Sequence, residues 1–172
     1  MKIILETERL VLRTFTPDDA QMFFDLNKDL EILEWIDEKP LKTLEEAETV
    51  LSEKILKGQY DVTGYGRWAI HIKKNGLFIG YCGLKNVEGE LDLGFRLKKK
   101  FRGKGFATEA ALAVIDYGFQ QLDANRIVAR VKAQNKACIA VLEKAGMQST
   151  EEKPSVFYDL IFEIKRQDWL QR

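Results

Sequence analysis

The segment from residue 91 to residue 131 constrains the fold more than any other part of the sequence. A short β-rich stretch (91–95) is followed by a loop with two glycines, a helical pattern (106–122) and a second β-rich stretch (126–131). A strand, a crossover helix and a second strand form a parallel pair with a right-handed connection. Because ligands bind where a parallel strand leads into a helix, we expect a binding crevice in front of this loop.

The other strands are expected to pair in antiparallel fashion. Residues 68–72 and 77–81 flank Asn75-Gly76, a strong hairpin signal, and a turn at 88–89 leads into the next strand. The remaining predicted elements are a strand at 10–15, helices from 17 and at 43–58 and 135–145, and two strands within 147–164 around a turn at 153–155. The sequence predicts a single mixed α/β domain, residues 1–172, with a mostly antiparallel sheet of about seven strands and four helices.

Composition excludes several partners. Lys plus Arg (27) equals Asp plus Glu (27), so no global field favours nucleic acid or a membrane surface. The N-terminal stretch is interrupted by charge, unlike a signal peptide, and no apolar run approaches the ~20 residues of a membrane span. Cys82 and Cys138 lack metal-ligand spacing, so no metal is expected. A cytoplasmic protein is the expectation. The sequence leaves the oligomeric state open, with a homodimer as one option.

The loop before the long helix has the features of an anion site. Glycines at 103 and 105 let the backbone approach a ligand closely, and the first amides of a helix lack intrahelical acceptors. Together with the helix dipole they suit a pyrophosphate. Six cations lie within nine residues: Arg96, Lys98, Lys99, Lys100, Arg102 and Lys104. The alternative interpretation is a solvated basic loop that caps a helix.

Spacing separates this loop from two nucleotide motifs. The dinucleotide fingerprint requires Gly or Ala where this chain has Thr108. The triphosphate loop requires Ser or Thr after Gly-Lys, but Gly105 follows Gly103-Lys104. A nucleotide-binding protein that uses the same anion site is therefore the weaker alternative.

Four motifs resemble those of the GNAT N-acetyltransferase superfamily. Arg-Gly-x-Gly-x-Ala at 102–107 resembles its coenzyme A pyrophosphate loop, and Asn135-Lys-Ala-Cys138 with Val-Leu-Glu-Lys-Ala-Gly-Met at 141–147 resembles its Asn-x-x-Ser…Leu-Glu-Lys-x-Gly-Phe segment. The opening at 6–13 and the closing Asp168-Trp169 are similar to the branch related to ribosomal-protein N-terminal acetyltransferases. The resemblance runs nearly end to end.

The resemblance implies a fold, a reaction and particular roles. The fold is GNAT-like, with a splayed parallel pair at the cofactor site. The reaction moves an acetyl group from acetyl-CoA to a primary amine, either a protein or peptide α-amine or a small-molecule amine. The implied cofactor-binding residues are Phe95, Arg96 and Leu97 for pantetheine, Arg102, Gly103, Lys104, Gly105, Phe106, Ala107 and Thr108 for the pyrophosphate, and Asn135 near the pantetheine. Asn135 also fits a helix N-cap.

The transfer itself needs a polarised carbonyl, which one strand amide near Phe95 can supply, and a neutral amine. Asp92 is the first candidate for the general base, followed by Glu90 on the same strand face and by Glu151. These carboxylates also fit a charged hairpin edge. An α-amine, with pKa ~8, is already neutral in a sizeable fraction near neutral pH, so it needs little help from such a base.

Cys138 stands where the family often has a Ser that protonates the leaving thiolate. It also lies on an apolar helical stripe, where cysteine behaves as a small buried hydrophobe, and this reading is favoured. In the branch that the sequence resembles, a longer loop often covers the acceptor, so by this resemblance the short turn at 153–155 implies an open acceptor site. Acidic residues expected to attract a basic acceptor, or to form a solvated helix end, are Asp29, Glu31, Glu34, Asp37 and Glu38. The main alternative to an enzyme is a coenzyme-A-binding sensor or interaction module without turnover.

Overall fold

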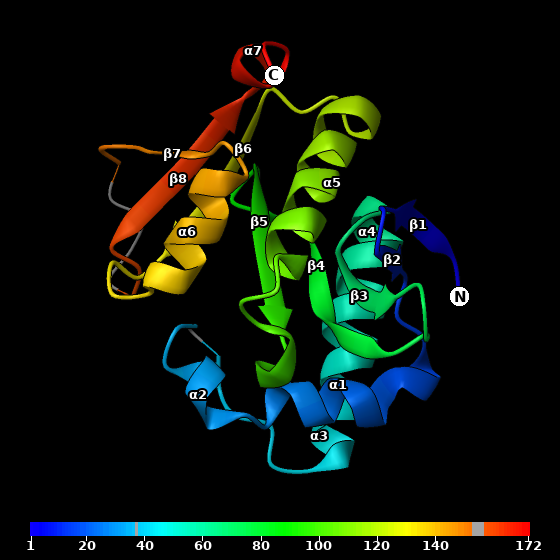
Figure 1. Ribbon diagram of the computed structural model, residues 1–172. Coiled ribbons are helices and arrows are strands. Elements are labelled where there is room, and N and C mark those ends of the chain that lie inside the picture. The colour runs from blue at the N-terminus through cyan, green and yellow to red at the C-terminus, as the bar shows by residue number, and fades with distance from the viewer. Residues whose placement is uncertain (37, 153–156) are drawn as a thin grey trace.

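A computed structural model describes residues 1–36, 38–152 and 157–172 of the chain. Within these residues one eight-stranded sheet runs in the order β1-β2-β3-β4-β5-β6-β8-β7 (Figure 1). The strands are β1 (Ile3–Glu6), β2 (Leu10–Arg13), β3 (Arg67–Ile72), β4 (Phe78–Val87), β5 (Glu90–Leu97), β6 (Arg126–Val131), β7 (Gln148–Ser149) and β8 (Leu160–Lys165). The additional strand relative to the sequence prediction is β1, which pairs with β2.

Helices lie on both faces of this sheet. They are α1 (Ala20–Asn27), α2 (Leu30–Leu33), α3 (Leu44–Val50), α4 (Asp61–Thr63), α5 (Phe106–Gln121), α6 (Lys136–Lys144) and α7 (Arg166–Trp169). Two 3-10 turns, η1 (Pro17–Asp19) and η3 (Lys99–Phe101), and a π-helical stretch, η2 (Leu51–Tyr60), accompany them. None of the helices described is long and apolar enough to cross a membrane.

The sheet is antiparallel except at one pair, as the sequence predicted. β5 and β6 are parallel and are connected through α5. β3 and β4 flank the predicted Asn75-Gly76 turn, and Glu88 and Gly89 adopt positive φ angles of 54° and 88° in the turn between β4 and β5. Such turns match the right-handed twist of the two strands that they join.

The helix predicted for 43–58 continues beyond its expected end. Thr43 caps α3 by accepting from the Glu46 amide at 3.2 Å, and η2 and α4 extend the helical segment to Thr63. Gly58 does not end the helix but lies within η2, where a Cβ would be 2.8 Å from the Glu53 carbonyl oxygen. The glycine instead accommodates the wider turn of the π-helix. The segment ends at Gly64, with φ of 76°.

Two apolar clusters, one on each face of the sheet, hold the helices against it. Helices α5 and α6 cover one face of the sheet over buried residues such as Leu84, Leu93 and Ile127. Helices α1 and α3 with η2 cover the opposite face only beside β2, β3 and β4, around Phe15 and Ala69. The part of that face over β5, β6 and β8 carries charged side chains instead. The predicted turn at 153–155 lies outside the described residues.

Candidate active site

The strands β5 and β6 separate where the glycine loop begins. Among the described residues their pairing covers only Leu91 with Ile127 and Asp92 with Val128, although β5 continues to Leu97. The Lys98 amide donates to the Ile79 carbonyl at 2.8 Å, so even-numbered residues of β5 direct their backbone groups toward β4. The backbone groups of Phe95 consequently face the gap between β5 and β6. This geometry fits the expected binding of pantetheine along the strand edge.

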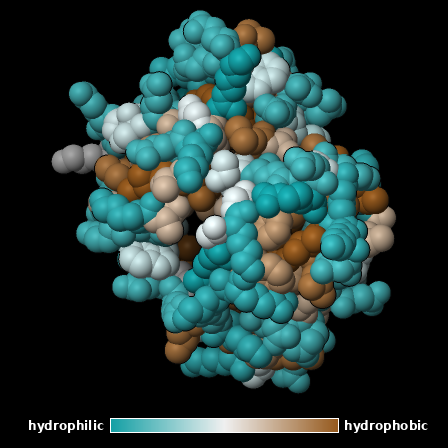
Figure 2. All heavy atoms as spheres, in the orientation of Figure 1, coloured by the Kyte–Doolittle hydropathy of each residue, from teal (hydrophilic) through white to brown (hydrophobic). Residues whose placement is uncertain are grey.

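A groove of about 2160 Å³ passes through this gap. Gly103, Gly105 and Thr108 line one end, and Phe95, Asn135 and Cys138 line the middle. The other end opens on the opposite face of the sheet. There it is lined by Arg67, Tyr81, Asp92 and Glu38. Figure 2 shows a recess between α6 and the end of β5 in an otherwise mostly hydrophilic surface. One groove therefore joins the glycine loop to the uncovered part of the sheet.

The loop has the backbone conformation that its glycines predict. Gly103 and Gly105 adopt φ of 73° and 82°, in the left-handed region that favours glycine. Gly105 is the N-cap of α5. The Glu109 amide is the first amide of the helix with an acceptor in the preceding turn, and it donates to the Gly105 carbonyl at 3.0 Å. The amides of residues 106–108 therefore have no acceptor within the helix. The loop and first turn fit a pyrophosphate, as expected.

A contact that sequence reasoning missed holds this loop in place. Arg9 donates to the Lys104 carbonyl at 3.1 Å and to Glu109 at 2.6 Å, and its guanidinium lies 4.5 Å from the centre of the Phe106 ring. Burial alone would raise the pKa of Glu109, but hydrogen bonds from Thr7 and Arg9 lower it. The signal in the sequence was the opening motif at 6–13, whose partner lies 100 residues away.

The cations beside the loop differ in their surroundings. Arg102 donates to the Leu97 carbonyl at 3.0 Å and to Asp29 at 3.3 Å, and Lys99 pairs with Glu31 at 2.7 Å. The Arg96 side chain is buried and points away from the glycine loop, toward Asn27 and Glu38. The expectation that Arg96 adds its charge to the phosphate site is therefore wrong for its side chain. Its backbone stays a candidate for pantetheine.

The acidic residues expected to attract an acceptor are largely neutralised by the chain itself. Asp29 pairs with Arg102, Glu31 with Lys99 and Arg102, and Glu38 with Arg96 at 2.9 Å. Lys132 donates to the backbone carbonyl of Glu34 at 2.9 Å. Asp37 lies outside the described residues. Of the four carboxylates that the structure describes here, those of Asp29, Glu31 and Glu38 are therefore paired with cations, and the segment is tied to β5 and to the end of β6.

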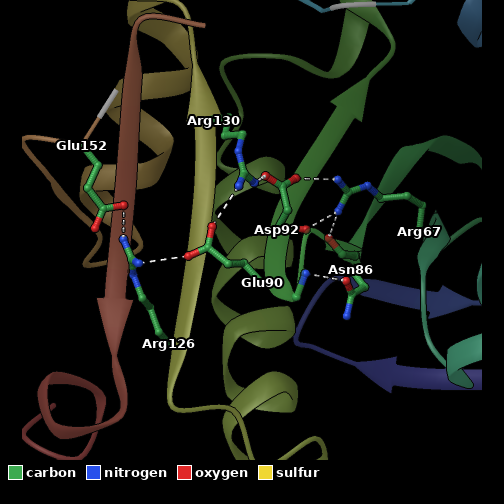
Figure 3. Close-up of polar contacts among 9 residues, drawn as sticks. Arg67, Asn86, Glu90, Asp92, Arg126, Arg130 and Glu152 are labelled. Atoms are coloured by element: carbon green, nitrogen blue, oxygen red, sulfur yellow. Dashed lines mark hydrogen bonds and ion pairs between the residues drawn. The ribbon is translucent and has the colours of Figure 1, made fainter. Parts of the chain in front are cut away.

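The favoured base, Asp92, is held between two arginines (Figure 3). Its Oδ1 accepts from Arg67 at 3.0 Å and its Oδ2 from Arg130 at 2.8 Å. The side chains of all three residues are 13% exposed. Both carboxylate oxygens therefore already accept a charged hydrogen bond. Asp92 lines the groove as part of an ion-pair network and not as an isolated carboxylate.

The same network includes the second candidate base. Glu90 accepts from Arg126 and Arg130, each at 2.9 Å, and Arg126 reaches Glu152 at 2.9 Å (Figure 3). The network crosses from β3 through β5 and β6 toward β7 and β8. Glu151, the third candidate, is exposed beyond β7. The charged-edge interpretation of Glu90 and Asp92 is wrong, because β5 lies inside the sheet between β4 and β6.

Asn135 and Cys138 meet at the start of α6. The Asn135 Oδ1 accepts from the Cys138 amide at 3.0 Å, which confirms the predicted N-cap. The Cys138 side chain packs against the core beside α5 and also lines the groove. Burial, with a smaller contribution from the Asp92 carboxylate, raises the pKa of the Cys138 thiol to about 12. The thiol therefore stays protonated near neutral pH.

No cluster of three or more potential His, Cys, Asp or Glu metal ligands occurs in the described part of the chain. Among the described residues the groove brings together strand and loop amides, ion-paired carboxylates and the Cys138 thiol. Amides that converge on a groove stabilise developing negative charge on an oxygen, which is the requirement for acyl transfer.

Comparison with known proteins agrees with this geometry. The sequence profile described as "Acetyltransferase (GNAT) domain" matches residues 9–148. The "Uncharacterized N-acetyltransferase p20" of Bacillus licheniformis is 32% identical over 150 residues, which cover 84% of this chain and 82% of that protein.

Two solved structures share the fold at lower identity. Spermidine N-acetyltransferase from Vibrio cholerae, in complex with CoA and spermine, superposes with a TM-score of 0.79 at 20% identity, covering 95% of this chain and 99% of that one. The ribosomal L7/L12 α-N-protein acetyltransferase RimL, in complex with coenzyme A, gives 0.80 at 18%, covering 95% and 98%. Members of the family use acetyl-CoA as the acyl donor. The chain belongs to the GNAT acetyltransferase family and is an N-acetyltransferase.

Proposed function

We propose that this N-acetyltransferase transfers the acetyl group of acetyl-CoA directly to a protein or peptide α-amine or to a small-molecule amine. The observation that carries the proposal is the groove through the β5–β6 gap. The donor binds at its glycine-loop end, and the acceptor enters from the uncovered face of the sheet. The two substrates then meet beside Phe95, with no need for a covalent enzyme intermediate.

The donor site is built mainly from backbone. Amides of Gly103 through Thr108 hold the pyrophosphate, and the gap-facing backbone groups of Phe95 hold the pantetheine arm. Acetyl-CoA supplies an activated thioester carbonyl. The amide of Phe95 is our candidate for the donor that polarises this carbonyl as negative charge develops on its oxygen. Asn135 caps α6 and lines the groove beside it.

The acceptor supplies its own nucleophile in the neutral form. Its nitrogen forms a bond to the carbonyl carbon, the carbon–sulfur bond breaks, and the thiolate leaves. The proton lost by the amine passes to water in the groove. We call Asp92 and Glu90, together with the arginines that pair with them, the acceptor floor. Because arginines occupy their carboxylates, these two residues contribute to the shape and electrostatics of the acceptor site and do not act as free bases. An α-amine, with pKa ~8, is neutral often enough near pH 7.4 for this route, whereas a lysine amine, near ~10.4, rarely is.

The solved relatives support amines of two kinds. One is described as acting on spermidine and the other on the α-amine of a ribosomal protein. Their low identity to this chain shows a shared fold and does not transfer an acceptor. We place α-amines first, because their lower pKa leaves a larger neutral fraction near neutral pH.

The experiment is a panel assay of thiol release from acetyl-CoA with peptides bearing free α-amines, spermidine, amino acids and aminoglycosides. We expect acceptor-dependent release, with α-amine acceptors giving the highest kcat/KM. Binding of acetyl-CoA with no acceptor-dependent release across the panel would instead favour a coenzyme-A-binding module. A preference for internal lysines over α-amines would contradict the choice of acceptor.

A further inference from the structure

One side of the groove is formed by residues 27–36 together with Glu38, here called the wall segment. Asn27, Leu33, Trp35, Ile36 and Glu38 line the groove from this side. In Figure 1 the segment lies below β5 and α6, with α2 at its centre. Its side-chain and backbone oxygens bond four cations of other elements: Arg96, Lys99, Arg102 and Lys132. The wall segment is therefore attached to the donor half of the site.

Arg96 connects both ends of the wall segment to β5. It donates through Nη1 to Asn27 at the end of α1 and through Nη2 to Glu38 at 2.9 Å. The guanidinium also lies 5.2 Å from the centre of the Tyr81 ring on β4. Arg96 is only 5% exposed. The Glu38 side chain is 59% exposed, so the pair joins a buried guanidinium to a carboxylate at the surface of the wall segment.

Arg102 connects the middle of the wall segment to the end of the same strand. Its Nε donates to the Leu97 carbonyl at 3.0 Å, while Nη2 and Nη1 lie 3.3 Å and 3.9 Å from Asp29 and Glu31. The two arginines thus attach the wall segment to the end of β5, through residues 96 and 97, directly after Phe95, the residue whose backbone faces the gap. Any displacement of the wall segment changes the space beside the reacting carbonyl.

We propose that Arg96 and Arg102 are positioning residues that hold the wall segment at a fixed separation from β5 and so determine acceptor selectivity. This inference rests on the proposed function, because it assigns the wall segment to the acceptor side of the groove. Arg96 acts through Asn27 and Glu38, and Arg102 acts through Asp29 and Glu31. Arg102 thereby links the pyrophosphate loop to the acceptor wall instead of serving only the phosphates.

The test compares Arg96→Met and Glu38→Gln with a matched control, Lys28→Met. Lys28 also carries a cation beside Asn27, but its ion pair with Asp25 lies within one turn of helix. Acetyl-CoA is the donor, and glycinamide and spermidine are the acceptor probes. A misplacement of about 1 Å in acyl transfer costs up to ~10²-fold. We expect Arg96→Met to raise the acceptor KM by at least ~10-fold and to reduce the discrimination between the two probes. Coenzyme A affinity, measured by calorimetry, should change little.

A second readout does not depend on turnover. Amide hydrogen exchange should accelerate in residues 27–36 of Arg96→Met and Glu38→Gln and stay unchanged in α5, while Lys28→Met behaves as wild type. Glu38→Gln removes one attachment at a half-exposed side chain, so it keeps the test available if Arg96→Met does not fold. Asp29→Asn tests the Arg102 attachment without altering the loop.

Two outcomes would overturn the inference. The first is equal loss of acceptor and coenzyme binding in the variants, which would indicate a general structural role. The second is unchanged exchange in residues 27–36 together with unchanged probe discrimination. Absence of thiol release by the wild-type protein with every amine tested would count against the proposed function instead, and the exchange measurement would still test the positioning role.

Discussion

Arg67 crosses the face of β4 to reach Asp92 on β5, where its Nη2 donates to Oδ1 at 3.0 Å and its Nη1 to the main-chain carbonyl at 2.8 Å. The side chain lies over Gly94, where a Cβ would overlap the guanidinium. The absence of a side chain at 94 is thus what lets a residue of β3 reach the acceptor floor.

Gly94→Ala should therefore displace Arg67 from Asp92 and destabilise the protein by about 1–3 kcal/mol, the usual cost of overpacking. Urea denaturation of the single and double variants measures this change in the free energy of unfolding. In an Arg67→Ala background the same substitution should cost much less, since the stability effects of substitutions at contacting residues are not additive. Equal costs in the two backgrounds would show that Gly94 is needed for another reason.

Gly105→Ala should abolish the increase in melting temperature that coenzyme A produces by mass action on the native state. The positive φ of Gly105 makes any side chain unfavourable by about 1–2 kcal/mol, so the substitution should move the loop amides that we propose bind the pyrophosphate. Gly64→Ala is the matched control, because Gly64 has a similar φ of 76° and no neighbour within 4 Å of the Cβ. It should lose comparable stability and keep the coenzyme-dependent shift. A shift retained in Gly105→Ala would argue against the loop as the pyrophosphate site.

Cys138→Ala should retain turnover to within about 10-fold, because a thiol whose pKa is raised to about 12 is a weak acid for a leaving thiolate. It should also lose some stability through a small cavity beside α5. Steady-state kinetics and urea denaturation of Cys138→Ala and Cys138→Ser check both statements. A loss of ~10²-fold or more in the Ala variant with recovery in the Ser variant would assign an acid role to this position.

The pH dependence of kcat/KM should follow the acceptor amine. With an α-amine acceptor the rate should rise between about pH 6.5 and 8.5, and with an amine of higher pKa the rise should move upward in parallel. Asp92→Asn should lower the plateau without moving the midpoint, because it disturbs Arg67 and Arg130 but removes no free base. A midpoint that is the same for all acceptors and is lost in Asp92→Asn would restore Asp92 as the general base.

Stability in acid should depend on Asp19, which is 8% exposed and bonds Arg13 through both oxygens at 2.6 and 2.8 Å. Burial opposes ionisation, but the hydrogen bonds from Arg13 and Thr16 lower the pKa of Asp19 below its ordinary value of 3.8. Its stabilising contribution is therefore complete above the ordinary value and is lost as the pH falls through the lowered one. Asp19→Asn should be less stable at pH 7 and should lose less stability on acidification. Parallel stability–pH curves for the two proteins would contradict this assignment.

Several local features could be predicted from neighbouring residues. The Asn75-Gly76 hairpin, the left-handed glycines of the loop and the Asn135 cap each depend on a few adjacent positions, and all three are present. The helix at 43–58 was predicted less accurately, because the helical segment continues through η2 and α4 to Thr63. Leu51 and Ile55 of η2 belong to the apolar cluster against the sheet, a tertiary contact that local propensity does not indicate.

The sequence by itself determined the parallel pair, most of the other strands and the left-handed glycine loop before α5, because hydrophobic periodicity, turn residues and glycine conformations act over short distances along the chain. Only the tertiary structure decided the partners of the charged side chains. Asp92 meets Arg67 and Arg130, Arg96 meets Asn27 and Glu38, and Arg9 meets Glu109, at separations of 25 to 100 residues. The residues next to a carboxylate or a guanidinium in the sequence do not indicate which charged group it will pair with. Their pairing, and with it the chemistry open to each group, follows from which strands and helices the fold brings together.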